Sequence, residues 1–92
     1  MVRTVKLTAR VDKQLAKLPA QVRAKLQTWA RAVREQGLEE VRKVPGYHDE
    51  PLVGKRQGQR SVRLNQQWRA IYVVEGDLVR VALVLEVTPH KY

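Results

Sequence analysis

Apolar residues recur at helical spacing in the first half of the chain. Six residues form this stripe: Leu15, Leu18, Val22, Leu26, Trp29 and Val33. Their intervals of three and four positions place them on one face of helical structure. Pro19 interrupts the stripe, but because it suits the first turn of a helix, it starts a second helix. The pattern predicts helices over Ala9–Leu18 and Pro19–Gln36, the second ended by Gly37, with their apolar face in the core.

Strand patterns lie on both sides of these helices. Val2–Leu7 is short and rich in β-branched residues, which favours a first strand. Towards the C-terminus, polar and apolar residues alternate over Gln59–Leu64, and apolar segments follow at Trp68–Val74 and Leu78–Val87. Short polar turns separate these segments, as between antiparallel strands. Leu38–Gly54, with its prolines and glycines, is predicted to be a connector.

The order of elements is therefore β-α-α-β-β-β, which predicts an α+β fold. We expect both helices to pack on one face of a small, mainly antiparallel sheet. The last strand is nearly all apolar over Val81–Leu85, which is typical of a central strand covered on both faces. With 92 residues and no internal repeat, the chain is expected to form a single domain over residues 1–92.

The composition narrows the choice of partners. The chain has 18 Lys and Arg against 9 Asp and Glu, a net charge of +9 and a pI near 10.5. This excess predicts a polyanionic partner, with nucleic acid or an acidic protein favoured over a membrane surface. No apolar run approaches the ~20 residues of a membrane span, and the N-terminus lacks a signal-peptide pattern, so we expect a cytoplasmic protein. With no cysteine and two histidines, the sequence predicts no metal site and no cofactor.

A cluster of positive charge lies in Pro51–Tyr72, a segment that is largely a predicted β-hairpin. The segment contains five cations and no acid: Lys55, Arg56, Arg60, Arg63 and Arg69. If Asn65–Gln67 is a three-residue loop, Arg63 faces Arg69 across the ladder, and facing like charges are destabilising unless an anion lies between them. The facing pair predicts a phosphate site, although two solvated arginines splayed apart would fit the same pattern.

If the polyanionic partner is RNA, these residues can be compared with the needs of metal-free RNA cleavage. A general base takes the proton of the 2′-OH, a cation stabilises the pentavalent phosphorane, and a general acid protonates the leaving 5′-oxygen. Arginine suits the second role because it stays charged and its fork matches phosphate oxygens. His90 is a candidate acid or base, since imidazole titrates near neutral pH. Tyr92 can stack on an RNA nucleobase, donate its phenolic proton, or only pack against the rest of the protein. Glu50 and His48 are candidate bases. The remaining cations are expected to hold flanking phosphates: Lys55, Arg56 and Arg60.

Four short motifs stand out in the second half of the chain. They are Glu50-Pro51-Leu52 with Gly54, Arg60-Ser61-Val62-Arg63-Leu64, Trp68-Arg69-Ala70-Ile71-Tyr72, and His90 with Tyr92. In this order they resemble the RelE/ParE superfamily of toxins from bacterial toxin–antitoxin pairs, and the similarity covers nearly the whole chain. The first and third motifs look most like the YoeB and HigB-type mRNA interferases. Those members cut mRNA in the ribosomal A site without a metal.

The resemblance implies a RelE-like, microbial-RNase-type fold and a role for each matching residue. Glu50 matches the position of a family general base, and Arg69 matches a transition-state arginine. His90 and Tyr92 match the C-terminal acid and base-stacking pair, while Arg63 matches a phosphate-binding residue. Family members differ in which residue acts as the base, so the identity of the base stays open.

The sequence and the resemblance together predict the toxin of a type II toxin–antitoxin pair. The expected activity is metal-independent cleavage of mRNA on the ribosome, by attack of the 2′-OH on the scissile phosphate. The implied partners are a cognate antitoxin, mRNA, the ribosome and, through the antitoxin complex, operator DNA. A ParE-like gyrase inhibitor is an alternative that His90 and Tyr92 disfavour. A non-catalytic nucleic-acid-binding module is a second alternative, which the net charge of +9 supports equally well.

Overall fold

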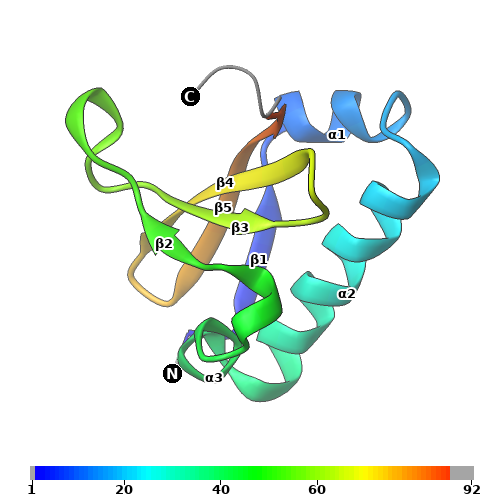
Figure 1. Cartoon of the computed structure of the whole chain (residues 1–92). Helices are drawn as coiled ribbons and strands as arrows, with labels where there is room; N and C mark the ends of the chain where they lie inside the picture. Colours follow the sequence, from blue (N-terminus) through cyan, green and yellow to red (C-terminus); the bar gives the residue numbers. More distant parts are fainter. Residues whose placement is uncertain (1, 88–92) are drawn as a thin grey trace.

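A five-stranded sheet backed by helices forms the fold. The computed structural model describes residues 2–87. Its helices are α1 (Ala9–Leu15), α2 (Ala20–Gln36) and α3 (Leu38–Arg42), with the 3₁₀ turns η1 (Pro45–Tyr47) and η2 (Gly54–Arg56). Its strands are β1 (Thr4–Leu7), β2 (Glu50–Pro51), β3 (Arg60–Arg63), β4 (Trp68–Glu75) and β5 (Leu78–Glu86). The helices α1 and α2 lie on one side of the sheet (Figure 1).

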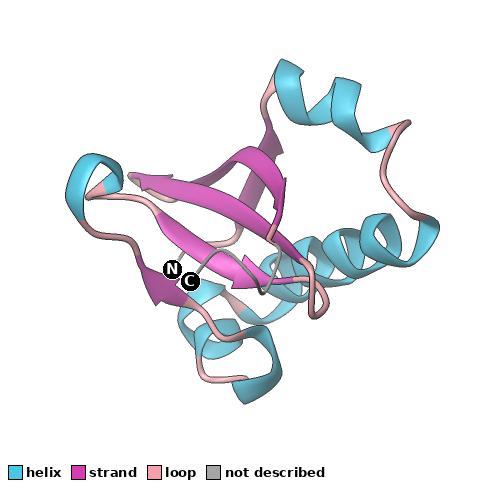
Figure 2. Ribbon diagram, turned by 45° about the horizontal axis from the view of Figure 1, so that its top comes forward, coloured by secondary structure: helices cyan, strands magenta, loops and turns pink. Residues whose placement is uncertain are grey.

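The sheet has the strand order β1-β5-β4-β3-β2. Figure 2 shows its strands in magenta and the helices in cyan. Strand β1 runs parallel to β5, and every other neighbouring pair is antiparallel. The α+β class and the mainly antiparallel sheet are therefore confirmed. Each predicted strand is present, with its ends shifted by at most two residues. Strand β5 is an interior strand, as its apolar sequence predicts.

Both predicted helices are present. Helix α1 begins after Thr8, whose Oγ1 accepts a hydrogen bond from the Val11 N–H at 3.3 Å. It ends at Leu15, three residues earlier than predicted, and a turn over residues 16–18 leads to Pro19. Pro19 is the N-cap of α2, and Gly37, with φ at 90°, ends it. No helix in residues 2–87 is long and apolar enough to cross a membrane.

The predicted connector Leu38–Gly54 contains more structure than expected. It includes helix α3, the turn η1 and the edge strand β2. Leu38 and Val41 of α3 are buried and extend the core beyond the end of α2. An element of five residues is too short to show a helical period in the sequence, so the prediction of a plain connector was wrong.

The helical stripe forms the hydrophobic core, as its spacing predicts. Val22, Leu26, Trp29 and Val33 are all fully buried on α2. The Trp29 ring packs against the Tyr72 ring of β4, with 5.3 Å between centroids and 45° between planes. Such tilted aromatic pairs add to the free energy of burial. This contact joins the helical layer to the middle of the sheet.

A β-bulge in β5 changes which of its side chains face the helices. Ile71 pairs with Leu83, but Tyr72 pairs with Val81, so Ala82 is an extra residue without a cross-strand partner. The alternation of side chains between the two faces of the sheet is therefore reset at Ala82.

The apolar residues of β5 divide between the two faces of the sheet. Val79 and Val81 before the bulge and Val84 after it all lie in the core against the helices. Leu83 and Leu85 lie on the opposite face of the sheet, where residues 2–87 provide no α-helix. The helices therefore cover one face of β5, as predicted for the sheet, and the expected cover on its second face is not a helix within residues 2–87. The face opposite the helices, which we call the open face, carries the candidate site.

Helix α1 also completes the hydrogen bonding of β5 where β1 ends. The side-chain amide of Gln14 donates from Nε2 to the Val84 carbonyl at 2.9 Å and accepts from the Val84 N–H at 3.1 Å. The Thr8 hydroxyl donates to the Ala82 carbonyl at 3.3 Å. Two side chains thus replace the missing neighbouring strand, and they fix the end of β5 that leads into the site.

Truncation of the core tryptophan should be strongly destabilising. We expect Trp29→Ala to lower the free energy of unfolding by about 3–5 kcal/mol, because it leaves a large cavity beneath Tyr72. Urea denaturation followed by circular dichroism at 222 nm measures the loss. The exposed neighbour Thr28 gives a matched control, and Thr28→Ala should stay within about 0.5 kcal/mol of wild type. Equal effects of both substitutions would contradict this assignment of the core.

Candidate functional site

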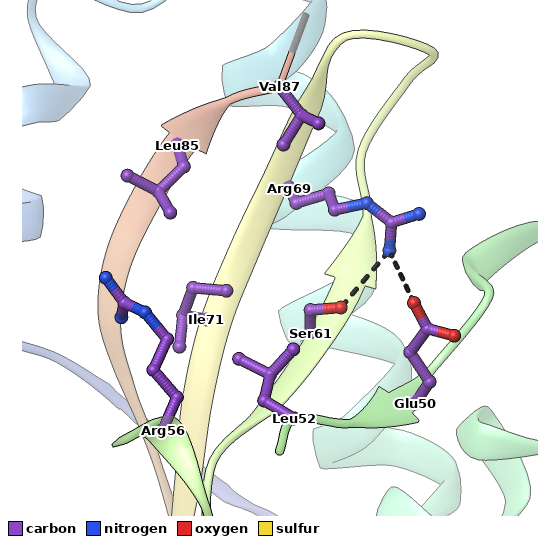
Figure 3. Close-up of a pocket in the computed structure, with 8 residues that line it drawn as sticks. All are labelled: Glu50, Leu52, Arg56, Ser61, Arg69, Ile71, Leu85 and Val87. Carbon is purple, nitrogen blue, oxygen red and sulfur yellow. Dashed lines mark hydrogen bonds and ion pairs between the residues drawn. The ribbon is translucent and has the colours of Figure 1, made fainter. Parts of the chain in front are cut away.

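The open face of the sheet carries a pocket of about 360 Å³. Eight residues from β2, η2, β3, β4, β5 and the segments beside them line it: Glu50, Leu52, Arg56, Ser61, Arg69, Ile71, Leu85 and Val87. Aliphatic side chains form one part of the wall, and a guanidinium, a hydroxyl and a carboxylate meet in another (Figure 3). The pocket therefore combines an apolar surface with a compact polar group.

Arg69 is the centre of this polar group. Its Nη1 donates to the Ser61 hydroxyl at 3.1 Å and to Glu50 Oε1 at 3.4 Å. Strand register brings the three residues together. Glu50 pairs with Ser61 on β3, Ser61 pairs with Ile71 on β4, and Arg69 lies two residues before Ile71 on the same face. The Ser61 side chain is buried, whereas that of Glu50 is 55% exposed. The structure thus unites two predicted site residues, Glu50 and Arg69, with a serine that sequence reasoning did not select.

The predicted pairing of Arg63 with Arg69 across the hairpin is confirmed. The loop has the expected length, since the Leu64 N–H donates to the Trp68 carbonyl at 2.9 Å. Asn65 shapes this loop, because its Oδ1 accepts from the N–H groups of Gln67 and Trp68, each at 2.8 Å. Among residues 2–87 no carboxylate forms an ion pair with Arg63. The two facing arginines therefore hold more positive charge than Glu50 alone neutralises.

The cations of η2 lie near the pocket but differ in placement. Arg56 lines the pocket, and its Nη1 donates to Gln59 Oε1 at 3.3 Å. Lys55 is exposed beside it. Their predicted role in holding flanking phosphates stays a prediction, and their positions are compatible with it.

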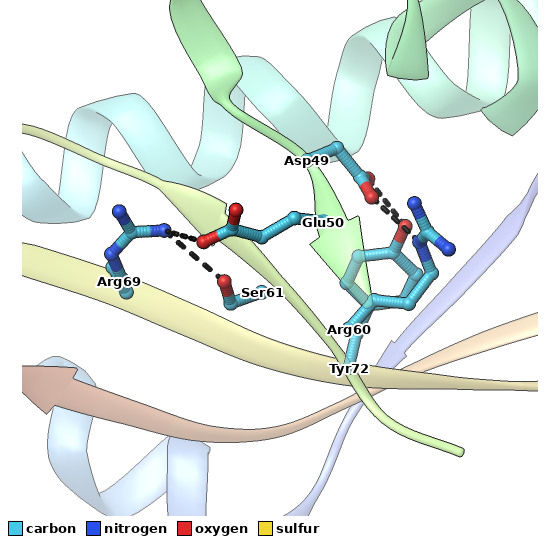
Figure 4. A network of polar contacts seen from close by, with 6 residues as sticks. All are labelled: Asp49, Glu50, Arg60, Ser61, Arg69 and Tyr72. Atoms are coloured by element: carbon cyan, nitrogen blue, oxygen red, sulfur yellow. Dashed lines mark hydrogen bonds and ion pairs between the residues drawn. The ribbon is translucent and has the colours of Figure 1, made fainter. Parts of the chain in front are cut away.

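Arg60 points away from the pocket. It shares β3 with Ser61 but reaches towards the helical side of the sheet, where its Nε donates to Asp49 Oδ1 at 2.6 Å (Figure 4). The other carboxylate oxygen of Asp49 accepts a short hydrogen bond from the Tyr72 hydroxyl. Only 1% of the Asp49 side chain is exposed. Arg60 is thus engaged in a partly buried ion pair, on the side of the sheet opposite Arg63 and Arg69.

Electrostatics in this buried network shift two pKa values. Burial, followed by the hydrogen bond to Asp49, raises the pKa of Tyr72 to about 12, while the nearby Arg42 guanidinium opposes the rise. Burial by itself would lower the pKa of Arg60, but the hydrogen bond and the charge of Asp49 outweigh it and raise that pKa. Tyr72 therefore stays protonated at neutral pH and acts as a fixed donor to Asp49.

The cation cluster of Pro51–Tyr72 is less uniform in space than in sequence. The segment itself has no acid, but Asp49 and Glu50 immediately precede it and fold back onto it. One pairs with Arg60 and the other with Arg69. Sequence reasoning missed Asp49, although a buried tyrosine hydroxyl in β4 needs a partner and was a signal that one exists.

Two predicted residues, His90 and Tyr92, lie outside the described residues. The described chain ends at Val87, which lines the pocket. His48, the weaker candidate base, is exposed in a left-handed conformation with φ at 46° and is not part of the pocket. Within residues 2–87, no group of three His, Cys, Asp or Glu side chains lies close enough together to hold a metal ion.

The polar group can hold an oxyanion next to a proton acceptor. Both contacts of Arg69 within the described residues use Nη1, so Nε and Nη2 form a fork that matches two phosphate oxygens. The exposed Glu50 carboxylate lies beside that fork and can accept a proton from a bound hydroxyl. This arrangement suits chemistry on a phosphate ester that has a neighbouring hydroxyl.

No protein-family model matches the chain, and no curated protein matches it by sequence. Solved structures do match. The RelE chain of the archaeal RelE–RelB complex from Pyrococcus horikoshii superposes with a TM-score of 0.73, at 19% identity over 97% of this chain and 99% of that one. The Staphylococcus aureus YoeB–YefM complex gives 0.71, at 14% identity over 92% and 97%. The YoeB/ParE toxin of Agrobacterium tumefaciens gives 0.66, at 19% identity over 92% and 99%.

The chain has the RelE/ParE toxin fold. The fold expected from the four sequence motifs is therefore confirmed over nearly the full length of the chain. Within this RelE/ParE toxin fold, the pocket lined by Glu50 and Arg69 lies on the open face of the sheet. Asp49 and its partners lie beside the edge strand β2.

Removal of the Tyr72 hydroxyl should destabilise the fold in a pH-dependent way. Tyr72→Phe should lower the free energy of unfolding at pH 7 by about 1–3 kcal/mol, because Asp49 loses a buried donor. Since the folded-state pKa of about 12 lies above the usual value of 10.0, the hydroxyl's contribution is fully present below pH 10 and is lost as the pH rises towards 12. Urea denaturation across this range should show the two proteins converging. A constant difference would contradict the raised pKa.

Proposed function

We propose that this chain is the toxin of a toxin–antitoxin pair and a metal-independent endoribonuclease that cleaves mRNA on the ribosome. The observation that carries the proposal is the contact of Glu50 with Arg69, at 3.4 Å, in a pocket on the open sheet face. A carboxylate next to an arginine fork supplies a base and a charge stabiliser at one phosphate. The net charge of +9 supports a nucleic-acid substrate.

In the proposed reaction, Glu50 takes the proton of the 2′-OH, whose oxygen attacks the adjacent phosphorus. Arg69, with Arg63 facing it, stabilises the charge that develops on the phosphorane oxygens. The bond from phosphorus to the 5′-oxygen then breaks, which leaves a 2′,3′-cyclic phosphate and a 5′-hydroxyl.

His90 is proposed as the acid that protonates the leaving 5′-oxygen, and Tyr92 as the residue that stacks on a base. His90 follows Val87 by three positions, and extended backbone advances by about 3.3 Å per residue. The short separation in sequence from a residue that lines the pocket supports this proposed role.

A partner protein is proposed to neutralise this site. The RelE and YoeB structures of similar fold are complexes with RelB and YefM. For this chain, the proposed antitoxin covers the open face and presents carboxylates to Arg63 and Arg69, because unpaired buried cations are costly. The proposed setting for the toxin, its antitoxin and the ribosome is the cytoplasm.

Loss of the arginine or the carboxylate should remove cleavage while the fold remains. We expect Arg69→Ala to slow single-turnover cleavage of ribosome-bound mRNA by about 10²–10³-fold, and Glu50→Gln by about 10²–10⁴-fold. Arg80 gives a matched control, since it also pairs with a glutamate, Glu75, at 3.0 Å on an exposed part of β5. Arg80→Ala should cleave at the wild-type rate. Wild-type rates for Arg69→Ala would refute the proposed role.

Charge reversal on the open face should weaken the complex with the antitoxin. The double variant Arg63→Glu/Arg69→Glu should raise the Kd by at least about tenfold, because attraction is replaced by repulsion at the interface. Isothermal titration calorimetry at fixed salt measures the change. The double variant Lys13→Glu/Lys17→Glu, at two exposed lysines of α1 and the turn after it, controls for the same change in net charge. An unchanged Kd for the double variant would show that the partner binds elsewhere.

A further inference from the structure

We propose that Asp49 is a positioning residue, whose buried carboxylate anchors β2 so that Glu50 lies against Arg69. The effect of Asp49 on RNA cleavage rests on the proposed function, whereas its anchoring of β2 does not.

Strand β2 has little to hold it by itself. It contains only Glu50 and Pro51, lies at the edge of the sheet and pairs only with β3. Pro51 has no N–H to donate to the ladder. The next backbone hydrogen bond runs from the Leu52 N–H to the Gln59 carbonyl at 2.9 Å. So short an edge ladder opens readily, and its ends fray.

The side chain of Asp49 supplies the missing anchor. It is 99% buried, and each of its oxygens has its own donor: Arg60 Nε at 2.6 Å and the Tyr72 hydroxyl. These donors come from β3 and β4, so the residue before β2 is tied to two strands of the sheet (Figure 4). A buried carboxylate that leaves these partners would lose both charge pairing and hydrogen bonding, which keeps it in place.

Alternation of side chains transmits this anchoring to the site. Adjacent residues in extended backbone point to opposite faces. Asp49 points to the helical side of the sheet and Glu50 to the open face, as Figure 4 shows. The Glu50 carboxylate is 55% exposed, and its contact with Arg69 is long at 3.4 Å. An exposed ion pair of that length is too weak to hold the β2 backbone in place. We therefore infer that Asp49 holds this backbone, and that the backbone in turn positions Glu50 beside Arg69.

The anchor itself can be tested without any activity. Asp49→Asn keeps the size of the side chain but removes its charge and one acceptor oxygen. We expect the Leu52 amide, which bonds across β2 and β3, to exchange its hydrogen at least about tenfold faster in this variant. Amides at the β4–β5 ladder should be unchanged. Glu75→Gln breaks a surface ion pair at the other hairpin and serves as the control. Unchanged exchange at Leu52 would overturn the anchor.

The catalytic consequence is tested by a double-mutant cycle. Asp49→Asn should slow single-turnover cleavage of ribosome-bound mRNA by about ten- to a hundredfold, because a displaced base loses alignment. Its affinity for a short single-stranded RNA should stay within about twofold of wild type, since Arg63 and Arg69 remain. If Asp49 acts through Glu50, the double variant Asp49→Asn/Glu50→Gln should cleave no more slowly than Glu50→Gln.

The outcomes separate the inference from the proposed function. If the double variant cleaves more slowly than Glu50→Gln, by the product of the two single rate losses, Asp49 acts independently of Glu50 and the positioning role is wrong. A wild-type chain that cleaves no RNA would refute the proposed function, while hydrogen exchange at Leu52 would still decide the anchor. If Asp49→Asn does not fold, Tyr72→Phe removes one donor to Asp49 without changing the net charge and takes its place in both experiments, with the same expected results.

Discussion

The buried hydrogen bond from Tyr72 to Asp49 joins the hydrophobic core to the edge of the sheet. The Tyr72 ring packs on Trp29 in the centre of the core, and its hydroxyl reaches the carboxylate that precedes β2. Because a buried carboxylate requires donors, the edge strand can lie where it does only when Tyr72 and Arg60 are in place. The geometry of the pocket on the open face depends on this edge, and therefore on the packing of the core.

Strand β4 serves the core and the candidate site at the same time. Ala70 and Tyr72 face the helices, whereas Arg69 and Ile71 face the pocket. The period of two along a strand makes this division possible in a segment of four residues. A rigid, buried strand therefore carries the arginine of the site, and such elements position functional groups more accurately than loops do.

Two adjacent carboxylates illustrate how burial separates structural from chemical roles. Asp49 is almost completely buried and has both oxygens engaged, so it is unsuited to exchange protons with a substrate. Glu50 is half exposed and holds one contact of 3.4 Å, so its carboxylate remains accessible to a substrate. The chain thus places a fixed charge and an available charge next to each other, on opposite sides of the same edge.

The sequence by itself determined the parts of this protein that follow from local periodicity. The helical stripe, the main strands and the facing of Arg63 and Arg69 could all be predicted, because spacing and loop length set them within a few residues. Tertiary structure decided the rest. The contacts of Asp49 with Arg60 and Tyr72 and of Glu50 with Arg69 join residues 11, 23 and 19 positions apart. The bulge at Ala82, which resets the alternation of side chains along β5, arises from the pairing of β5 with β4. Local sequence patterns do not predict such contacts, because they form only when β2 pairs at the edge of a sheet that is already packed against the core.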